Sequence, residues 1–267
     1  PFVIIIFYQN TTGNGKSQRK ILTKIKKTID FQVYFNATIF STILRKRRFS
    51  AEKKGDFIMS VDVTKMPKLG FGMMRLPEKD GELDLEQICK MVDAYLASGM
   101  NYFDTAYMYC GGKSESIVKK ALVERHPRES FTLTTKLPQW MMDEGIEGRD
   151  RIFNDQLART GAGYFDYYLL HSVEDGANYE GYVKYDCFNW AKKKKEEGLI
   201  KHFGFSFHGT PELLDKILSE HPEVEIVQIQ MNYADWDNPL IQSGRLYEVL
   251  RKYLSLIHIS EPTRHSL

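Results

Sequence analysis

Residues 101–136, in the middle of the chain, read NYFDTAYMYCGGKSESIVKKALVERHPRESFTLTTK. An apolar, strand-like run occupies Asn101–Thr105, and a second run occupies Phe131–Lys136. Between them an amphipathic helix is predicted to begin near Ser114, with one face made of Val118, Ala121 and Leu122. A strand, a helix and a strand in this order are typical of parallel strands joined by a crossover helix.

The same alternation continues on both sides of this stretch. Strand-like runs are predicted at Lys68–Met74, Asn101–Thr105, Phe131–Lys136, Tyr164–His171, Ile200–Ser206 and Val224–Met231. Helices are predicted between and after them, and two carry clear start signals: Asp84 with Gln87 as a capping box, and Thr210 before Pro211. Six units of about 32 residues imply about 260 residues for eight, close to the usual size of a (β/α)8 barrel.

The predicted fold is therefore α/β, a (β/α)8 TIM barrel that is incomplete here, with about six of its eight units. A doubly wound sheet would alternate in the same way. However, the first strand–helix turn, from Met73 to Asp84, lacks the G-x-G-x-x-G motif of a dinucleotide-binding sheet. The barrel is the better interpretation.

Charge is divided unevenly along the 267 residues, whose formal net charge is +2. Residues 1–58 contain 12 Lys and Arg against 3 Asp and Glu, whereas residues 59–267 contain 25 against 32. The acidic larger part predicts no nucleic-acid partner. Three widely spaced cysteines exclude a CxxC-type metal site and a disulfide framework. No apolar run approaches the roughly 20 residues that cross a bilayer, so no membrane partner is expected.

The two ends of the chain differ from its centre. Residues 1–58 show no sustained strand or helix period and contain no methionine, and codons for Lys54–Met59 resemble a ribosome-binding site before a start codon. We interpret residues 1–58 as a non-native translated leader, with a transit peptide as the alternative. Residues 254–264 can be back-translated into a transposase-type sequencing adapter, so residues 254–267 are interpreted as an artefactual tail, with a native tail as the alternative.

The barrel domain is thus predicted to span residues 59–253 and to be cut off there. Two strands, Lys68–Met74 and Val224–Met231, would then face a gap where two more strands belong. We expect no segment of residues 1–58 to fill it, because none has a strand or helix pattern.

Ionisable side chains stand where three successive predicted strands end: Asp104, Lys136 and His171. Tyr109 lies on the loop after Asp104. Taken singly, such an Asp or Lys is usually a cap or a surface ion pair, and such a His or Tyr usually packs in the core. Because the strands of a barrel all end at one face, their coincidence predicts a shared site in which buried charges compensate one another.

These four side chains suit proton donation. Free tyrosine titrates near pH 10, and a neighbouring ammonium favours the phenolate, so we expect Lys136 to make Tyr109 a better acid. Asp104 would keep Lys136 charged, and His171 would hydrogen-bond and orient a carbonyl oxygen. No H-x-H motif stands at a strand end, which disfavours a paired-histidine metallohydrolase.

Several motifs resemble the aldo-keto reductase superfamily. They are Phe103-Asp104-Thr105-Ala106-Tyr107-Met108-Tyr109, Gly112-Lys113-Ser114-Glu115, Thr134-Thr135-Lys136, Leu169-Leu170-His171, Met66-Pro67-Lys68-Leu69-Gly70-Phe71-Gly72, Gly204-Phe205-Ser206 and Val227-Gln228-Ile229. The resemblance extends from Met66 to about Tyr253. It implies a cytoplasmic, NADP- or NAD-dependent oxidoreductase that transfers a hydride to a small aldehyde or ketone on a (β/α)8 barrel.

The resemblance also implies roles for individual residues. Tyr109 would be the proton donor, tuned by Lys136 and Asp104, and His171 would orient the substrate. The cofactor would contact five residues: Gly72, Met73, Met74, Ser206 and Gln228. The Asn that usually follows the Ser in the family is Phe207 here, so that contact does not carry over.

Three further motifs resemble a bacterial branch of the family. They are Gly70-Phe71-Gly72-Met73-Met74-Arg75-Leu76-Pro77, Ser206-Phe207-His208-Gly209 and Gln230-Met231-Asn232-Tyr233. Full-length members of that branch carry a C-terminal ferredoxin-like domain with a 4Fe-4S cluster, which would lie beyond this chain. An alternative function is a nucleotide-binding barrel that acts as a regulatory or electron-transfer partner subunit. We expect the fragment itself to be inactive; substrate and oligomeric state stay open.

Overall fold

The computed structural model describes residues 6–7, 69–231, 235–253 and 256–260. All of them belong to one of the chain's two compact units, the one made of residues 1–10 and 61–267. Most of the predicted leader and tail lies outside the described residues, as do Asn232 and Tyr233. The predicted division into leader, barrel and tail therefore stays a prediction.

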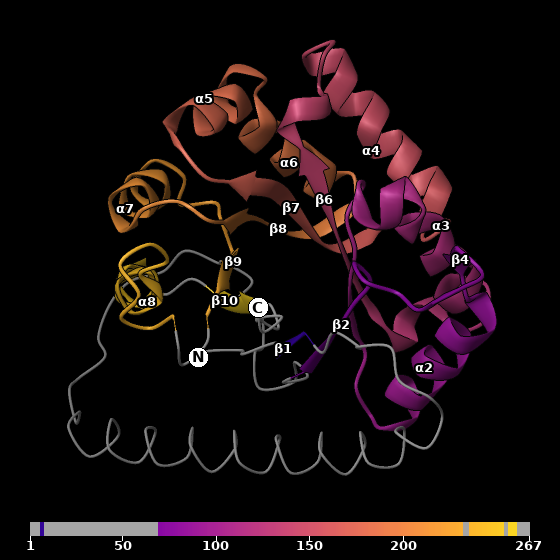
Figure 1. The fold of residues 1–267 in the computed structure, drawn as a ribbon. Coiled ribbons are helices and arrows are strands. Elements are labelled where there is room, and N and C mark those ends of the chain that lie inside the picture. The colour runs from indigo at the N-terminus through magenta and orange to yellow at the C-terminus, as the bar shows by residue number, and fades with distance from the viewer. Residues whose placement is uncertain (1–5, 8–68, 232–234, 254–255, 261–267) are drawn as a thin grey trace, which may run out of the picture. The chain divides into compact units, whose positions relative to one another are not determined.

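A curved, eight-stranded parallel sheet forms the centre of this unit, with helices along its outer side (Figure 1). Its strands, in spatial order, are β1 (Ile6–Phe7), β2 (Leu69–Gly72), β5 (Tyr102–Asp104), β6 (Thr132–Pro138), β7 (Phe165–Val173), β8 (Ile200–Phe207), β9 (Ile226–Gln230) and β10 (Leu256–Ser260). Spatial order follows chain order, as successive crossover units require. The arrangement confirms the predicted incomplete (β/α)8 barrel.

Helices connect most of the strands. They are α2 (Leu85–Ala97), α3 (Ser114–Val118), α4 (Ile146–Thr160), α5 (Gly176–Lys184), α6 (Cys187–Glu196), α7 (Pro211–Glu220) and α8 (Ser243–Tyr253). Shorter elements are the β3–β4 hairpin (Glu78–Lys79, Glu82–Leu83), the 3-10 turns η1 (Tyr109–Gly112), η3 (Arg128–Ser130) and η4 (Gln139–Met141), and a π-helical turn η2 (Lys119–Val123). As predicted, Asp84 caps α2 through the Gln87 amide at 3.0 Å, and Thr210 caps α7.

The structure differs from the prediction at both edges of the sheet. β1 pairs with β2, and β10 pairs with β9 over five residue pairs from Leu256↔Ile226 to Ser260↔Gln230. Both added strands come from the segments interpreted as leader and tail. An exposed apolar edge strand offers free backbone groups to any extended apolar segment, which is the physical reason for the pairing. In the described part of the sheet, β1 and β10 are the outer strands.

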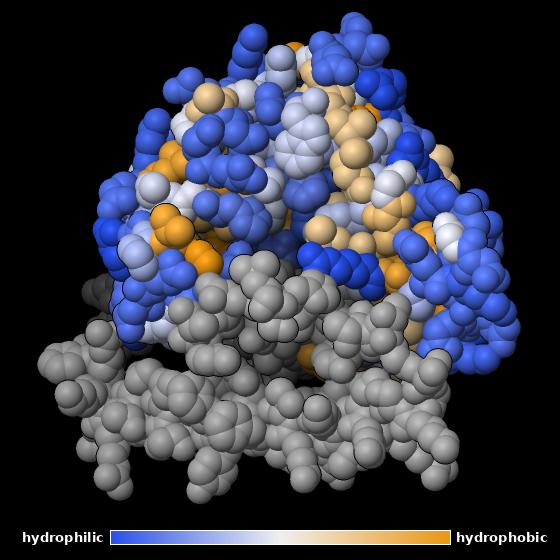
Figure 2. Space-filling view, viewed as in Figure 1, coloured by the Kyte–Doolittle hydropathy of each residue, from blue (hydrophilic) through white to orange (hydrophobic). Residues whose placement is uncertain are grey.

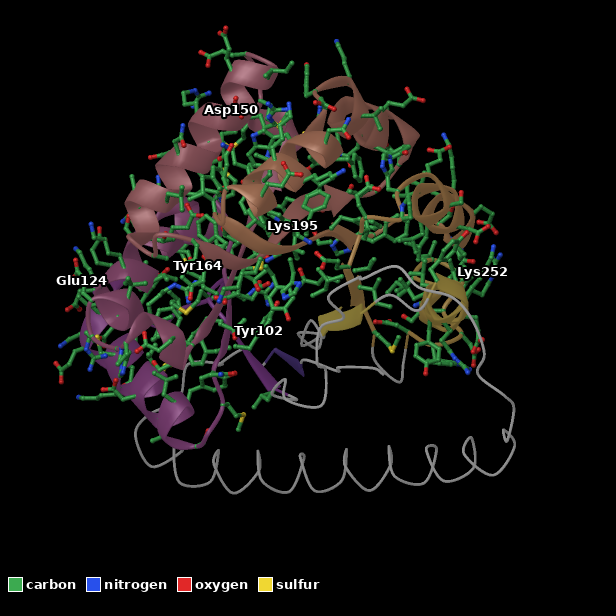
Figure 3. All side chains as sticks on the ribbon, turned by 180° about the vertical axis from the view of Figure 1, so that it is seen from behind. Tyr102, Glu124, Asp150, Tyr164, Lys195 and Lys252 are labelled. Carbon is green, nitrogen blue, oxygen red and sulfur yellow. The ribbon has the colours of Figure 1, made fainter. Side chains whose placement is uncertain are left out.

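Side chains alternate between the two faces of the sheet. On β8, Phe203, Phe205 and Phe207 are buried in the core beneath the helices. On the opposite face, Tyr102 packs against Tyr167, whose ring stacks on His202. The labelled Tyr102 lies among the strands in Figure 3, whereas Glu124 and Lys252 lie at the periphery. Hydrophilic residues cover much of the helical surface seen in Figure 2.

One glycine is required by the packing of the strands. A Cβ on Gly204 would lie 1.7 Å from the carbonyl oxygen of Ile226, on the neighbouring strand β9. A side chain there would push the two backbones apart. Gly204 thus allows β8 and β9 to approach where both lead to polar residues, Ser206 and Gln228, which are register partners.

Candidate active site

The inward face of the sheet brings the predicted strand-end residues to one place. Asp104 is the last residue of β5 and faces Thr134 of β6 across the ladder. Lys136 lies two positions after Thr134, so its side chain emerges on the same face. Three strands' C-terminal ends therefore supply the ionisable groups, as the sequence predicts.

Lys136 is the centre of the cluster. Its side chain is 1% exposed, and its Nζ donates to Asp104 Oδ1 at 2.6 Å, to the carbonyl oxygen of Thr105 at 2.9 Å and to the Tyr109 hydroxyl at 3.3 Å. Burial by itself lowers the pKa of Lys136, but Asp104 and Tyr109 outweigh it and hold the pKa above its ordinary value. Lys136 is thus a charged ammonium with three acceptors.

Asp104 completes the buried ion pair. Its second oxygen, Oδ2, accepts a longer bond from Gln228 Nε2 at 3.4 Å. Burial raises the pKa of the Asp104 carboxyl, and the neighbouring ammonium of Lys136 opposes that rise. The carboxylate therefore depends on Lys136 for its compensation, as the sequence analysis expects.

A tight turn places Tyr109 over Lys136. Immediately after Tyr109, the residues Cys110 and Gly111 adopt left-handed backbone angles, with φ of 53° and 63°. Glycine tolerates this conformation, and Cys110 is held in it by contacts from its Sγ to the carbonyl oxygens of Met73 and Met74. The turn reverses the chain at once and leaves the tyrosine side chain on the cluster.

Lys136 lowers the pKa of Tyr109, as expected, but the net pKa lies above its ordinary value. Burial raises it above the ordinary value, and the attraction of Lys136, which lowers it, is the smaller effect. Desolvation of the phenolate outweighs one neighbouring cation. Tyr109 is therefore a fully protonated hydroxyl at neutral pH.

His171 faces Tyr109 from the end of β7. The two ring centroids are 5.8 Å apart in an edge-to-face arrangement, and Trp140 of η4 lies 5.1 Å from the imidazole on another side. Burial, followed by the positive charge of Lys136 and by His208, lowers the pKa of His171 to about 3. The imidazole is neutral, and its Nδ1 is buried with no hydrogen-bond partner.

The proposed cofactor contacts occupy two regions. Ser206 and Gln228 are both buried, and the Ser206 Oγ accepts a 2.7 Å bond from the Ser172 amide. On the other side, Gly72 pairs in register with Asp104. Met73 is fully buried in the core, while Met74 is exposed. Ser206, Gln228 and Gly72 thus lie by the cluster, whereas the Met73 side chain is directed into the core.

Three residues of the site were not predicted. Trp140 packs on His171, Tyr182 of α5 hydrogen-bonds the backbone of both β6 and β7, and Ser172 has a left-handed φ of 57°. Trp140 stands four residues after Lys136, just past the end of the same strand, and this position in the sequence could have indicated it. Tyr182 had none, because its hydroxyl bonds backbone groups that are 45 and 11 residues away in the sequence.

Other features of the described residues lie apart from this cluster. A cavity of about 830 Å³ is lined by α7, α8 and the segment between β9 and α8, and none of the four clustered residues forms its wall. No set of three or more His, Cys, Asp or Glu side chains in the described part is placed to bind a metal ion. No helix there is both long and apolar enough to cross a membrane.

Comparison with known proteins identifies the family. A sequence profile described as Aldo/keto reductase family matches residues 68–259. Probable aldo-keto reductase 1 of Glycine max is 31% identical over 177 residues, 63% of this chain and 48% of that protein. Uncharacterized oxidoreductase YqkF of Bacillus subtilis (strain 168) is 27% identical over 204 residues, 69% of this chain and 60% of that protein. The chain thus spans less than two thirds of either relative.

A solved structure shows the same fold. An aldo/keto reductase from Klebsiella pneumoniae, in complex with NADP and acetate, matches with a TM-score of 0.56 at 21% identity, over 72% of this chain and 62% of that chain. The profile match contains every strand from β5 to β9 and all four clustered residues. This chain belongs to the Aldo/keto reductase family.

Proposed function

We propose that this protein reduces small aldehydes or ketones in the cytoplasm with a hydride from NADPH or NADH, and that Tyr109 is the proton donor. The observation that carries the proposal is the position of Lys136 Nζ, 2.6 Å from Asp104 Oδ1 and 3.3 Å from the Tyr109 hydroxyl. A hydroxyl that gives its proton to a carbonyl oxygen becomes a phenolate, and an adjacent ammonium stabilises that new charge.

The raised pKa of Tyr109 agrees with this role. A donor that stays protonated until the substrate oxygen gains negative charge is stabilised by Lys136 mainly in the transition state, which is where stabilisation accelerates a reaction. Asp104 holds the ammonium in place through the shortest contact of the cluster. Lys136 and Asp104 are thus proposed as the groups that tune Tyr109.

His171 is proposed to orient the carbonyl oxygen. With a pKa of about 3 it is neutral at pH 7 and does not compete with Tyr109 as an acid. Its Nδ1 is enclosed by protein, which leaves Nε2 for the substrate. A neutral imidazole that carries its hydrogen on Nε2 is a hydrogen-bond donor.

The inward residues fit a nicotinamide. When bound, that cofactor supplies the hydride. Ser206 and Gln228 offer a hydroxyl and an amide at register-paired positions, which suits both the oxygen and the nitrogen of a carboxamide. We propose Gly72, Met73 and Met74 as further contacts at the end of β2, with Met73 limited to its backbone because its side chain is buried in the core. The match to a structure that holds NADP, and family membership, support this assignment.

Replacing Tyr109 with Phe tests the proposal. We expect turnover of an aldehyde with NADPH to fall about 10²- to 10⁴-fold, because only proton donation is lost, while NADPH binding stays within about twofold. Tyr107→Phe is the matched control, because its hydroxyl bonds Asp155 at 2.7 Å rather than Lys136. The assay uses the longer product that the gene encodes, because the 267-residue fragment itself is expected to be inactive. Equal turnover in Tyr109→Phe would assign the acid to another group.

A second part of the proposal concerns the bacterial branch with the iron–sulfur domain. The described residues do not fit a 4Fe-4S cluster, since they hold three separate free cysteines, Cys89, Cys110 and Cys187. A longer gene product with the visible absorption of a cluster would support the branch, and one without it would remove it. Wild-type protein that binds NADPH but reduces no carbonyl compound would favour the alternative, a regulatory or electron-transfer partner subunit.

A further inference from the structure

We propose that Tyr182 is a positioning residue of the site, because its hydroxyl ties the end of the strand that carries Lys136 to the end of the strand that carries His171. Tyr182 belongs to α5, is fully buried and touches neither Lys136 Nζ nor the imidazole through its hydroxyl. The consequence for turnover rests on the proposed reductase function. The structural role stands on the contacts alone.

Three backbone groups meet at the Tyr182 hydroxyl. It lies 2.7 Å from the carbonyl oxygen of His171 and 2.9 Å from that of Leu137, and it accepts a bond from the Gln139 amide at 3.1 Å. A phenol has one hydrogen, so the two carbonyl oxygens share it. Leu137 directly follows Lys136 in β6. A single buried oxygen thus links β6, β7 and η4 where the ionisable side chains emerge.

His171 needs such an anchor because its own ring lacks one. A functional histidine is usually fixed by a hydrogen bond from its second ring nitrogen, but Nδ1 of His171 is buried without a partner. The backbone around it is also irregular: the β7–β8 register shifts between Leu170 and Val173, and Ser172 is left-handed. A bulge of this kind re-aims a side chain. The bond at the His171 carbonyl therefore helps to decide where the bulge directs the ring.

The same hydroxyl also fixes the other wall of the imidazole. Its amide donor, Gln139, is the first residue of η4, and the next residue is Trp140, whose half-exposed ring packs on His171. Helix α5 approaches η4 closely at Gly181, where an added Cβ would lie 2.5 Å from the Gln139 side-chain nitrogen. Tyr182 thus holds both the backbone of His171 and the aromatic ring beside it.

Tyr182→Phe removes the hydroxyl and keeps the buried ring. Tyr179→Phe is the matched control, because Tyr179 is one turn earlier on α5, is also buried, and donates to Glu220 at 2.6 Å, away from the strand ends. We expect kcat for carbonyl reduction to fall about 10- to 100-fold in Tyr182→Phe, with KM for NADPH within about twofold, and to change little in Tyr179→Phe. Equal kcat in the two variants, at matched unfolding midpoints, would overturn the proposal.

A readout without catalysis separates this inference from the proposed function. In a pH titration of the imidazole resonances by NMR, His171 of wild type and of Tyr179→Phe should stay neutral well below pH 6.5, beside the Lys136 ammonium and the titratable side chains of His208 and Tyr109. In Tyr182→Phe the titration should move upward, because a loosened ring gains solvent. An unchanged titration refutes the positioning role even if wild type reduces no carbonyl compound, an outcome that would itself refute the proposed function.

Discussion

Two ion clusters stand at opposite ends of the same sheet, and they are built differently. At the C-terminal ends of the strands, Lys136 pairs with Asp104. At the N-terminal ends, Asp166 near the start of β7 pairs with Arg128 at 2.8 Å and with Lys201 at 2.9 Å. Both clusters are ion pairs between an Asp carboxylate and a Lys or Arg side chain. They differ in how many hydrogen bonds the polar atoms of each cluster make.

In the cluster at the N-terminal ends of the strands, both Asp166 and Arg128 also form hydrogen bonds with backbone groups. Asp166 Oδ2 also accepts from the Leu133 amide at 2.9 Å. Arg128 donates to the carbonyl oxygens of Ala162, Phe131 and Tyr164, and its guanidinium lies 3.7 Å from the centroid of the Tyr164 ring. These ion pairs and hydrogen bonds join η3 to β6, β7 and β8. We read it as a structural cluster.

The C-terminal cluster leaves one polar atom, His171 Nδ1, buried without a hydrogen-bond partner. Burial holds the pKa of Tyr109 above its ordinary value, and His171 has an unpartnered Nδ1 and a pKa of about 3. Groups shifted in opposite directions at one site are typical of acid–base chemistry. The comparison teaches that burial of charge alone does not mark the candidate site; the site is distinguished by shifted tyrosine and histidine pKa values beside the buried ion pair.

The largest expected effect comes from Lys136→Met. It leaves Asp104 buried without its cation, so we expect stability to fall by about 3–5 kcal/mol and carbonyl reduction to reach background. Urea unfolding and an NADPH assay measure the two effects. The double variant Lys136→Met with Asp104→Leu should regain stability but no activity, since no buried charge remains. Activity in either variant would contradict the role of Lys136.

Arg128→Met is the counterpart at the other end of the sheet. Loss of its bonds to Asp166 and to three carbonyl groups should cost about 2–3 kcal/mol of unfolding free energy, with kcat of the folded protein unchanged. Lys201→Met is the matched control: it contacts the same carboxylate, but 52% of its side chain is exposed, so we expect less than about 1 kcal/mol. A kcat loss in Arg128→Met would break the comparison.

Periodicity and strand ends were enough to predict part of the site. Asp104, Lys136 and His171 each close an apolar run, so the face they share follows from parallel strands meeting at one edge. Tyr109 was included for its place on the loop just after Asp104, and the resemblance to the family then implied its role as proton donor. The lowering of its pKa by Lys136 was predicted, but the larger rise from burial was not, since the degree of burial is not visible in the sequence.

Other features depend on contacts between distant segments. Tyr182 bonds Leu137 of β6 and His171 of β7, which are 45 and 11 residues away in the sequence, and no local sequence pattern predicts such a bond. The strands β1 and β10 were missed because their pairing depends on which sheet edges are left open, not on their own sequences. The bulge at Ser172 likewise follows from the register of β8 against β7.

The smallest expected effect is a pH dependence that only the C-terminal cluster should show. Burial first, then Lys136 and His208, lower the pKa of His171 from 6.5 to about 3. Below pH 6.5 the unfolded chain binds a proton at this residue, and the folded protein does not until about pH 3. Stability is therefore lost as pH falls through that window, by at most about 1.4 kcal/mol per pH unit from this group.

Urea unfolding at pH 7, 6 and 5 measures this slope. His171→Gln does not titrate, so its unfolding free energy should decline less than that of wild type between pH 6 and 5, with the difference approaching one proton. Arg128→Met should keep the wild-type slope, because the cluster of Arg128, Asp166 and Lys201 contains no histidine. Identical slopes in wild type and His171→Gln would mean that the imidazole is solvated in the folded protein. His171 would then no longer distinguish the cluster at the C-terminal ends of the strands from the cluster of Arg128, Asp166 and Lys201.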